Sequence, residues 1–270
     1  YDGPVIEEKR VAYEILSLLK RKPLFIVEKY DVKTIEYHPP PAFNLGDLQS
    51  EAARIYGFSP YKTQVIAEKL YLEALISYPR TNSQKLPPTI DFKGIMNGLK
   101  QIPRYSKLID ERVFETKGRL QPVQGEKDDP AHPAIYPTGL KPESLKEDEW
   151  KIYDLITRRF LAAFAERAVV ERRLVVLKHV EDNRIVFHGS GQQIVKRGWI
   201  KYYPFIDLGE TYLPVFKPGE RIVVDKIDLR KTYTKPPERI SKIKLLKWME
   251  SVEIGTESTR ARIIETLFKR

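Results

Sequence analysis

The apolar positions at the beginning of the chain change from helical to strand spacing. Over residues 5–20 they recur on one face of a helix, and Lys and Arg near its end suit the helix dipole. Residues 23–38 place β-branched and apolar residues among charges, which predicts a strand. Pro39–Pro41 end that strand and mark a boundary.

The following stretch, residues 43–165, is predicted to be mainly helical. Ser59 can cap a helix whose first residue is Pro60, and an apolar stripe carries this helix to Leu75. Tyr78 follows where the helix stops, and Pro79 restricts it to an extended backbone. The other helices predicted here are Leu45 to Ile55, residues 90–101 and residues 145–166.

Residues 168–229 carry strand signals, and helices return after Pro236-Pro237. Ser241 is expected to cap the first of these helices, and the second covers Ser258 to Lys269. Residues 1–42 are too short for a β domain of their own, so we expect them to join the later strands. The predicted strands are Ala168–Val180, Arg184–His188, Gln193–Val195, Tyr212–Phe216 and Arg221–Leu229.

Composition narrows the class of protein. A hydrophobic content of 41% supports a packed core, and a net charge of +10 favours a polyanionic partner, nucleic acid first, or a solvated basic surface. The chain has no cysteine, which excludes disulfides and thiolate zinc sites, and its four histidines lack ligand spacing. No apolar run approaches the ~20 residues of a membrane helix. Because the chain opens at Tyr1, we expect a piece of a longer protein.

The segment Ile76–Ser83 contains the most informative motif. A phenol holds its proton up to a pKa of about 10, so tyrosine is a poor nucleophile at neutral pH. An arginine close to the tyrosine can bind a phosphate and stabilise the charge that develops during phosphoryl transfer. Tyr78 and Arg80 therefore suit covalent phosphoryl transfer, although most of the 15 tyrosines are expected to be packing residues.

Several further segments occur in a fixed order around this motif. Together they resemble type IA DNA topoisomerases, most closely the archaeal topoisomerase I/III branch, over nearly the whole chain. The segments are Phe43–Gln49, Ile76–Ser83, Asp128–Thr138, Gly198-Trp199, Thr234–Arg239 and Ile254–Ala261.

The resemblance implies a multi-domain α+β fold in which a β-rich arch domain is interrupted by a mainly helical domain with the catalytic tyrosine. A helical segment of the core DNA-binding domain would follow. The expected segments are residues 1–42 and 168–234 for the arch, 43–167 for the helical domain and 235–270 for the core segment.

The same resemblance implies roles for individual residues. Tyr78 would attack a phosphate of single-stranded DNA and hold its 5′ end as a phosphotyrosine, while Arg80 would contact the scissile phosphate. His132 matches the histidine of a His-x-Ala-Ile segment that contacts the DNA backbone near the nucleophile. Glu68 matches a position that is often glutamine, and Asn82 stands where many relatives have aspartate, which puts an acid or metal role there in doubt.

Other DNA contacts are expected in the last forty residues. Ser258, Thr259 and Arg260 would hold phosphate at the start of a helix, although Ser258 can also act as a plain N-cap. Lys235 and Arg239 belong to a basic run, with aromatic residues between, that suits either phosphate neutralisation with base stacking or a solvated face. The run comprises Lys231, Tyr233, Lys235, Arg239, Lys242, Lys244, Lys247 and Trp248, of which Trp248 is expected in the core.

The family's metal site, a carboxylate cluster on a Toprim domain, has no match in this sequence. The resemblance therefore implies a fragment without the amino-terminal Toprim domain, which alone binds single-stranded DNA weakly and does not relax supercoils. The intact enzyme would use Mg²⁺ bound outside this chain and no ATP. It would act as a monomer at the nucleoid in the cytoplasm, relaxing negative supercoils or decatenating.

Two alternatives remain open at this point. One is a non-catalytic single-stranded DNA-binding module in which Tyr78 is structural; the pairing of Tyr78 and Arg80 with the His132 loop argues against it. The other is a tyrosine recombinase, which needs several dispersed arginines in a different order and does not explain the strands. Substitution of Tyr78 by Phe would separate catalysis from DNA binding.

Overall fold

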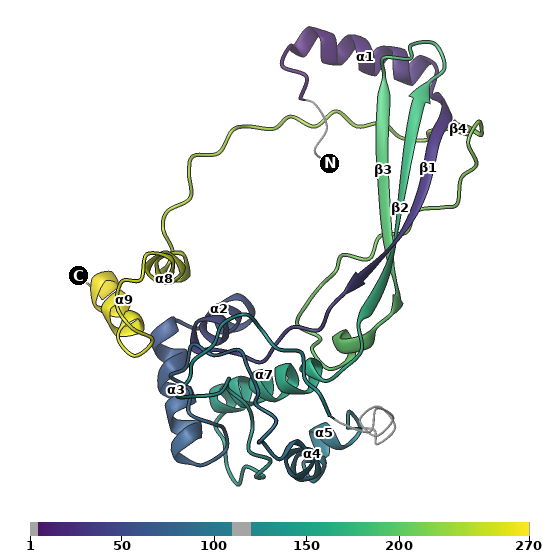
Figure 1. The fold of residues 1–270 in the computed structure, drawn as a ribbon. Coiled ribbons are helices and arrows are strands. Elements are labelled where there is room, and N and C mark those ends of the chain that lie inside the picture. The colour runs from purple at the N-terminus through teal and green to yellow at the C-terminus, as the bar shows by residue number, and fades with distance from the viewer. Residues whose placement is uncertain (1–4, 110–119, 270) are drawn as a thin grey trace. The chain divides into compact units, whose positions relative to one another are not determined.

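The computed structural model describes residues 5–109 and 120–269 (Figure 1). The chain divides into two compact units, and each is made of segments that are distant in sequence. The sheet unit contains the described residues of Tyr1–Tyr37, Val169–Lys196 and Asp207–Pro237. The helical unit contains those of His38–Ala168, Arg197–Ile206 and Glu238–Arg270.

A four-stranded sheet in the order β3-β2-β1-β4 organises the sheet unit. The helix α1 precedes it, and β2 and β3 form a long antiparallel pair (Figure 1). The short β4 pairs antiparallel with the beginning of β1. The bounds are α1 Lys9–Arg21, β1 Leu24–Tyr37, β2 Ala168–His179, β3 Val186–Lys196 and β4 Arg221–Val223.

The turn between β2 and β3 is fixed by Asp182. Its carboxylate accepts hydrogen bonds from the backbone N–H of Arg184 at 3.0 Å and from the Arg184 guanidinium at 2.9 and 2.8 Å. The two strands then pair from Lys178 opposite Val186 to Val169 opposite Lys196, with one irregularity next to Val169. This turn lies at the boundary between the predicted strands Ala168–Val180 and Arg184–His188.

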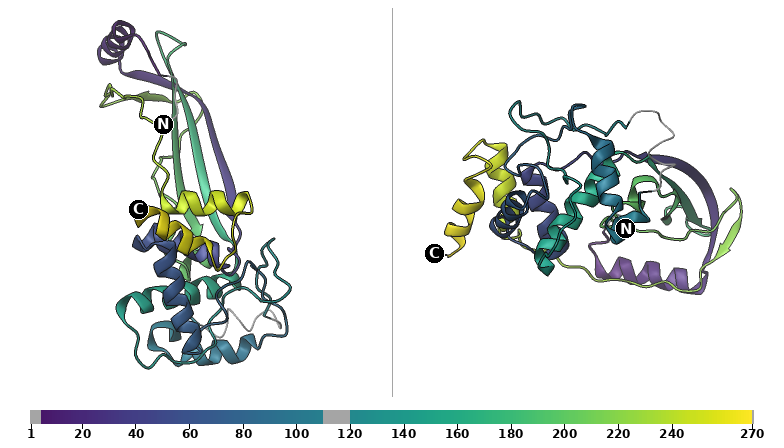
Figure 2. Two further views of the ribbon diagram at one scale, coloured as in Figure 1. Left: turned by 90° about the vertical axis from the view of Figure 1, so that its left-hand side faces the viewer. Right: turned by 90° about the horizontal axis from the view of Figure 1, so that it is seen from below.

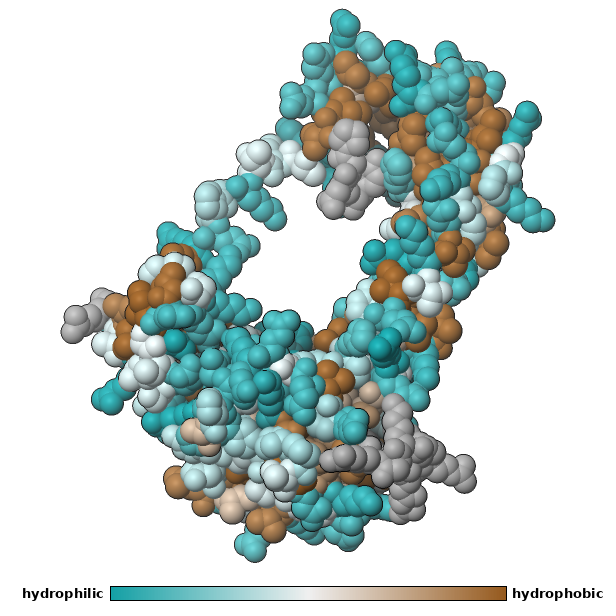
Figure 3. Space-filling model, viewed as in Figure 1, coloured by the Kyte–Doolittle hydropathy of each residue, from teal (hydrophilic) through white to brown (hydrophobic). Residues whose placement is uncertain are grey.

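Few side chains of the sheet unit are fully buried. Phe25 packs edge-on against His179 and Phe187, with ring centroids 5.3 and 5.4 Å away. The buried His179 places Nε2 2.7 Å from the carbonyl of Lys22, while the N–H groups of Glu181 and Asp182 donate to Nδ1. Along the unit, hydrophobic residues are interspersed with hydrophilic ones (Figure 3). This sheet therefore has a small core near one end.

The helical unit is built on three longer helices, α2, α3 and α7, which pack on one another. The helices α8 and α9 pack on each other, and α8 contacts α2 while α9 contacts α3, as Figure 2 also shows. The bounds are α2 Leu45–Tyr56, α3 Pro60–Leu72, α4 Phe92–Lys100, α5 Pro103–Ser106, α7 Glu147–Ala163, the 3₁₀ helix η1 Gly198–Lys201, α8 Lys242–Ser251 and α9 Arg260–Lys269.

The helix α7 lies at the centre of this unit (Figure 1). Its apolar residues are buried nearly all round the helix, which is the pattern of a core helix. Phe160 packs against Phe92 and Phe164, with ring centroids at 6.4 and 5.0 Å. The buried Tyr105 hydroxyl donates to Asp154 at 2.9 Å, and burial followed by that carboxylate's charge raises the pKa of the phenol far above its usual range.

Side-chain caps start two helices where the sequence predicts them. Ser59 accepts a hydrogen bond from the N–H of Lys62 at 3.2 Å, and Ser241 accepts one from the N–H of Lys244 at 3.2 Å. Both predicted caps are confirmed. The first helix begins at Lys9 rather than at residue 5.

Several predicted elements differ from the structure. The segments Arg184–His188 and Gln193–Val195 lie largely in one strand, β3, because β2 pairs across the glycines between them. Residues 212–216 form no strand, and Thr211 makes only an isolated bridge to Gln192. The strand predicted at Arg221–Leu229 stops at Val223, since β4 has β1 as a partner only over three residues.

Trp248 is the clearest wrong prediction. The core of the α8–α9 pair is formed by Leu246, Met249 and Ile264, and Trp248 is 54% exposed. The α+β class is confirmed. Among the described residues, no helix is both long and apolar enough to cross a lipid bilayer.

Candidate active site around Tyr78

Tyr78 lies on an extended segment that leaves the end of α3. Ala74 has a φ of 57°, and the N–H of Leu75 donates to the carbonyl of Leu70 at 2.9 Å, which ends the helix. The helix therefore stops at Leu72, three residues before the predicted Leu75. The segment is then held by Ser77, whose N–H donates to the Tyr136 carbonyl at 2.9 Å and whose Oγ accepts from the Tyr136 N–H at 3.0 Å.

The half-buried phenol ring of Tyr78 contacts two other rings. Tyr71, on the last turn of α3, meets it edge-on with centroids 5.3 Å apart. The ring of His132 lies 4.8 Å away at an interplanar angle of 38°. The structure thus brings Tyr78 and His132 together, although they are far apart in the sequence. Such packing fixes the ring of Tyr78 and leaves part of the residue accessible.

The side chain of Arg80 is held in place by Glu68 on α3. Its Nε donates to Glu68 Oε1 at 2.8 Å, and its Nη2 lies 2.7 Å from the same oxygen. Gln64, one turn earlier on α3, donates its Nε2–H to that oxygen at 2.8 Å. Arg80 therefore follows Tyr78 by two residues, and its guanidinium is held by α3, the helix that precedes the Tyr78 segment.

His132 has an acidic neighbour in Asp129. The Nδ1 of His132 lies 3.6 Å from Asp129 Oδ2. Burial raises the pKa of Asp129, but the N–H of Ala131 and the charge and hydrogen bonds of His132 outweigh burial and hold it below its usual value. The hydroxyl of Thr81 donates to the His132 carbonyl at 3.3 Å. Asp129 is thus an ionised partner that restricts the imidazole beside Tyr78.

The beginning of α2 supports the residues that follow Arg80. The side chain of Asn44 caps α2 by accepting the N–H of Asp47 at 2.8 Å, and its Nδ2 donates to the Asn82 carbonyl at 3.3 Å. The N–H of Leu45 donates to the carbonyl of Thr81 at 3.0 Å. The segment Phe43–Gln49 therefore positions the polypeptide immediately after Arg80.

The polar side chains of the segment before α9 form hydrogen bonds with other groups of the same segment. The guanidinium of Arg260, a residue that is 8% exposed, donates to the carbonyls of Ile254 and Gly255, each at 2.9 Å, and to Glu257 at 3.1 Å. The hydroxyl of Thr256 bonds to those of Ser258 at 2.9 Å and Thr259 at 3.1 Å. The helix begins at Arg260, two residues after the predicted start at Ser258.

The other predicted DNA contacts are exposed. Lys235 and Arg239 lie in the extended segment before α8, and Tyr233 there is 75% exposed. Two lysines of the same basic run have acidic partners, since Lys242 bonds to Glu265 at 2.7 Å and Lys244 to Glu238. The basic run is therefore partly neutralised, and its exposed aromatic rings remain accessible for stacking.

The described residues do not fit a Mg²⁺ site. They contain no group of three or more His, Cys, Asp or Glu residues that could hold a metal ion. Beside Tyr78, the carboxylates of Glu68 and Asp129 already bind Arg80 and the N–H of Ala131, respectively.

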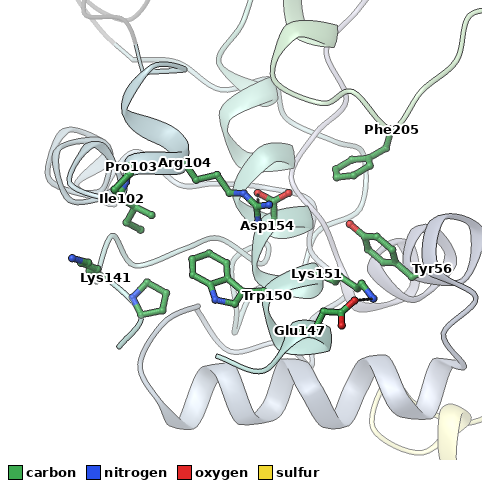
Figure 4. Close-up of a pocket in the computed structure, with 11 residues that line it drawn as sticks. Tyr56, Ile102, Pro103, Arg104, Lys141, Glu147, Trp150, Lys151, Asp154 and Phe205 are labelled. Atoms are coloured by element: carbon green, nitrogen blue, oxygen red, sulfur yellow. Dashed lines mark ion pairs between the residues drawn. The ribbon is translucent and has the colours of Figure 1, made fainter. Parts of the chain in front are cut away.

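A pocket of about 810 Å³ lies elsewhere in the helical unit, beside α5 and α7 (Figure 4). Trp150, Tyr56 and Phe205 give it aromatic walls. Its charges are largely compensated: Lys151 lies 2.7 Å from Glu147, and Arg104 lies 3.9 Å from Asp154. This pocket therefore does not present the concentrated positive charge of a phosphate site.

Sequence reasoning missed the partners of the predicted site residues. It left Asp129, Gln64 and Thr81 without roles and weighted Glu68 lightly. The spacing of Gln64 and Glu68, one helical turn apart, could have indicated a shared face of α3, but nothing local indicated that this face meets Arg80.

Comparison with known proteins identifies the family. A family model described as DNA topoisomerase matches residues 2–270. DNA topoisomerase 1 of Aeropyrum pernix is 50% identical over 260 residues, 96% of this chain and 38% of that protein. DNA topoisomerase 1 of Pyrococcus horikoshii is 42% identical over 267 residues, 98% of this chain and 38% of that protein.

A solved structure agrees with this comparison. The structure of full-length topoisomerase I from Thermotoga maritima is similar with a TM-score of 0.74 and 27% identity, over 100% of this chain and 44% of that one. The chain therefore belongs to the type IA DNA topoisomerase family, as the sequence predicted. It spans 38% of the length of each of the two archaeal relatives.

Proposed function

We propose that this chain supplies the nucleophile of a type IA DNA topoisomerase. The phenol of Tyr78 gives up its proton as its oxygen attacks a phosphodiester of single-stranded DNA and forms a new P–O bond. The bond from phosphorus to the 3′ oxygen breaks, and the leaving oxygen takes up a proton. The DNA 5′ end is then held as a phosphotyrosine, and the reverse reaction reseals the strand. Because the phosphodiester energy is retained in the phosphotyrosine, no ATP is needed.

The arrangement of Tyr78, Arg80 and His132 supports this proposal. Tyr78 is partly accessible, Arg80 follows two residues later, and the imidazole of His132 packs 4.8 Å from the phenol ring. Arg80 would bind the scissile phosphate and stabilise its developing charge, because a guanidinium matches the geometry of phosphate oxygens. His132, restrained by Asp129, would contact the DNA backbone beside the nucleophile.

We propose that the exposed basic run guides the single strand. Lys235 and Arg239 would neutralise phosphates, and the exposed rings of Tyr233 and Trp248 suit base stacking. The hydroxyls of Ser258 and Thr259 lie before the first turn of α9, where helical N–H groups favour phosphate. Arg260 would act on DNA through the turn that it holds, because its donors bind that turn.

The remaining parts of the activity are assigned by analogy with the family. The sheet unit would belong to the arch domain, with flexible junctions at Pro39–Pro41 and residues 165–170 that open a gap for strand passage. Mg²⁺ and its carboxylates would come from a Toprim domain outside this chain. The complete monomeric enzyme would relax negative supercoils or decatenate at the nucleoid, and the 270-residue chain alone would not.

Covalent trapping of DNA tests this proposal. A hybrid enzyme is made by placing this chain into DNA topoisomerase 1 of Aeropyrum pernix, in exchange for the matching segment. A 3′-labelled single-stranded oligonucleotide is incubated with the hybrid enzyme and Mg²⁺, denatured and separated on a gel. The label is expected to migrate with the protein, because the 3′ fragment carries the 5′ phosphotyrosine. The Tyr78→Phe variant should give no adduct.

Tyr71→Phe is the matched control, because Tyr71 packs against the same ring. It should retain the adduct, and anisotropy on the isolated chain should show similar oligonucleotide binding for all three proteins. An adduct that persists in Tyr78→Phe would disprove Tyr78 as the nucleophile. Absence of any adduct, with DNA binding intact, would favour the non-catalytic DNA-binding module instead.

A further inference from the structure

One carboxylate oxygen on α3 has three side-chain nitrogens within 2.8 Å, two of them from Arg80. Glu68 Oε1 accepts hydrogen bonds from Arg80 Nε and from Gln64 Nε2, each at 2.8 Å, and it lies 2.7 Å from Arg80 Nη2 as an ion-pair partner. The contact therefore uses only the Nε side of the guanidinium. Among the described residues, no hydrogen bond or ion pair joins Nη1 of Arg80 to another group.

This geometry gives the guanidinium a bound side and an open side. A planar guanidinium can bind two partners at once, because its donors point in different directions within one plane. With the Nε side on Glu68, the Nη1 side is left for a second anion. A free arginine side chain would have to lose rotational freedom to present that side to a phosphate.

Gln64 indicates that the arrangement is specific. This residue is 6% exposed, and its Oε1 is buried without a hydrogen-bond partner in the described part of the chain. Leaving a buried acceptor unpaired is unfavourable, and such groups are uncommon in folded proteins. Gln64 nevertheless donates its amide N–H to Glu68 at 2.8 Å, which restricts the position of the carboxylate.

We propose that Glu68 is a positioning residue for Arg80. It fixes the guanidinium by its Nε side so that the Nη1 side meets the scissile phosphate, and Gln64 fixes Glu68. This inference rests on the proposed function of Tyr78 and Arg80. It predicts an effect of Glu68 on the rate of cleavage at saturating DNA, because orientation of the guanidinium matters most as charge develops on the phosphate.

A role in fold stability alone is a poor explanation for this pair. The side chains of Glu68 and Arg80 are 32% and 35% exposed. Ion pairs that are open to solvent contribute little to stability. The chain also offers an internal comparison on the same helix, since Lys69 pairs with Glu149 at 2.7 Å without contacting Tyr78 or Arg80.

The test uses the hybrid enzyme and single-turnover cleavage of the labelled oligonucleotide. The variants are Glu68→Ala, Glu68→Gln, Arg80→Ala and the double variant Glu68→Ala with Arg80→Ala. The matched control is Lys69→Ala, which breaks a neighbouring ion pair on α3. Both the saturating cleavage rate and the half-saturating DNA concentration are measured, and thermal melting checks that each variant is folded.

Glu68→Ala is expected to lower the saturating rate about tenfold, with a much smaller change in the half-saturating concentration. Glu68→Gln should recover most of the rate, because the amide oxygen can still accept from Arg80 Nε. In the Arg80→Ala background, Glu68→Ala should have no further effect, since Glu68 acts through Arg80. Lys69→Ala should leave the rate near that of the unmodified hybrid enzyme.

Three outcomes would overturn the inference. An unchanged or faster rate in Glu68→Ala would mean that Glu68 does not orient Arg80 productively. An equal loss with and without Arg80 would mean that Glu68 acts independently of it. A loss confined to DNA affinity would assign Glu68 to binding. Failure of the proposed function is distinguishable, because it appears as an adduct that survives Tyr78→Phe.

Discussion

The two units of this protein differ in how completely their side chains are buried. In the helical unit, α7 has fully buried residues on most of its surface, including Tyr153 and Phe160. In the sheet unit, most positions of β1 after Val27 and most of β3 are half-buried or exposed. Dense packing therefore characterises the helices against which the segments with Tyr78, Arg80 and His132 lie, and the sheet has one small core around Phe25 and His179.

This difference in burial shows which unit can hold side chains in fixed positions. A catalytic side chain must be held close to its productive geometry, and tightly packed helices achieve this better than a thin sheet. The extended segment with Tyr78 is anchored to α2 through Leu45 and to a neighbouring loop through Ser77. The sheet unit depends mainly on strand pairing, which tolerates exposed side chains.

Replacing a phenylalanine by alanine in each unit should give the largest difference between the units in lost unfolding free energy. Phe160→Ala removes a fully buried ring and is expected to cost about 3–5 kcal/mol of unfolding free energy in the helical unit. Phe187→Ala removes a half-buried ring and is expected to cost roughly 1–2 kcal/mol in the sheet unit. Urea unfolding measured by tryptophan fluorescence and by circular dichroism separates these effects.

The tryptophans make this experiment selective. All three, Trp150, Trp199 and Trp248, lie in the helical unit. Phe160→Ala should therefore lower the fluorescence midpoint, whereas Phe187→Ala should change mainly the circular dichroism. An equal fluorescence shift for the two variants would show that the units unfold as one.

A smaller effect on stability should distinguish an arginine that supports the fold from an arginine that binds DNA. Arg260→Ala removes three hydrogen bonds around the turn before α9 and is expected to cost about 1–3 kcal/mol. Arg239→Ala, at an exposed position, should leave the melting temperature unchanged and weaken binding of single-stranded DNA in a salt-dependent way. Thermal melting and anisotropy at two salt concentrations measure both. Weaker DNA binding by Arg260→Ala at unchanged melting temperature would refute its structural role.

The smallest effect on stability is expected from a substitution in the β2–β3 turn of the sheet unit. The Arg184 side chain, followed by its backbone N–H, lowers the pKa of Asp182 from 3.8 to about 2. Because the folded-state pKa lies below the unfolded one, the stabilisation is present above the unfolded pKa and disappears as pH falls through about 2. Asp182→Asn should slightly lower the melting temperature of the sheet unit at neutral pH. The difference from the unmodified chain should shrink on acidification, and a constant difference would contradict this account.

Much of the fold could be predicted because its signals are local. The caps at Ser59 and Ser241 depend on a side chain and an N–H three residues later, and both are present in the structure. Strand ends were less predictable, since a strand continues only as far as it has a partner. β4 stops at Val223 although the alternating pattern continues beyond it.

The candidate site was predictable only in part. The order of Tyr78, Arg80 and the His132 loop pointed to phosphoryl transfer and to the family. The partners of these residues could not be predicted, because Asp129 and His132 meet the Tyr78 segment only after distant segments fold together. Trp248 was misplaced because helical spacing alone does not say which face has a neighbour.

By itself, the sequence determined the helices and strands, the motif at Tyr78 and Arg80, and membership of the type IA DNA topoisomerase family. These follow from interactions within one or two turns and from the order of motifs along the chain. Only the tertiary structure decided that Glu68 holds Arg80 by its Nε side and that the Arg260 guanidinium is committed to a turn. Side-chain orientation depends on which surfaces are brought together, and that is settled by packing across the whole unit.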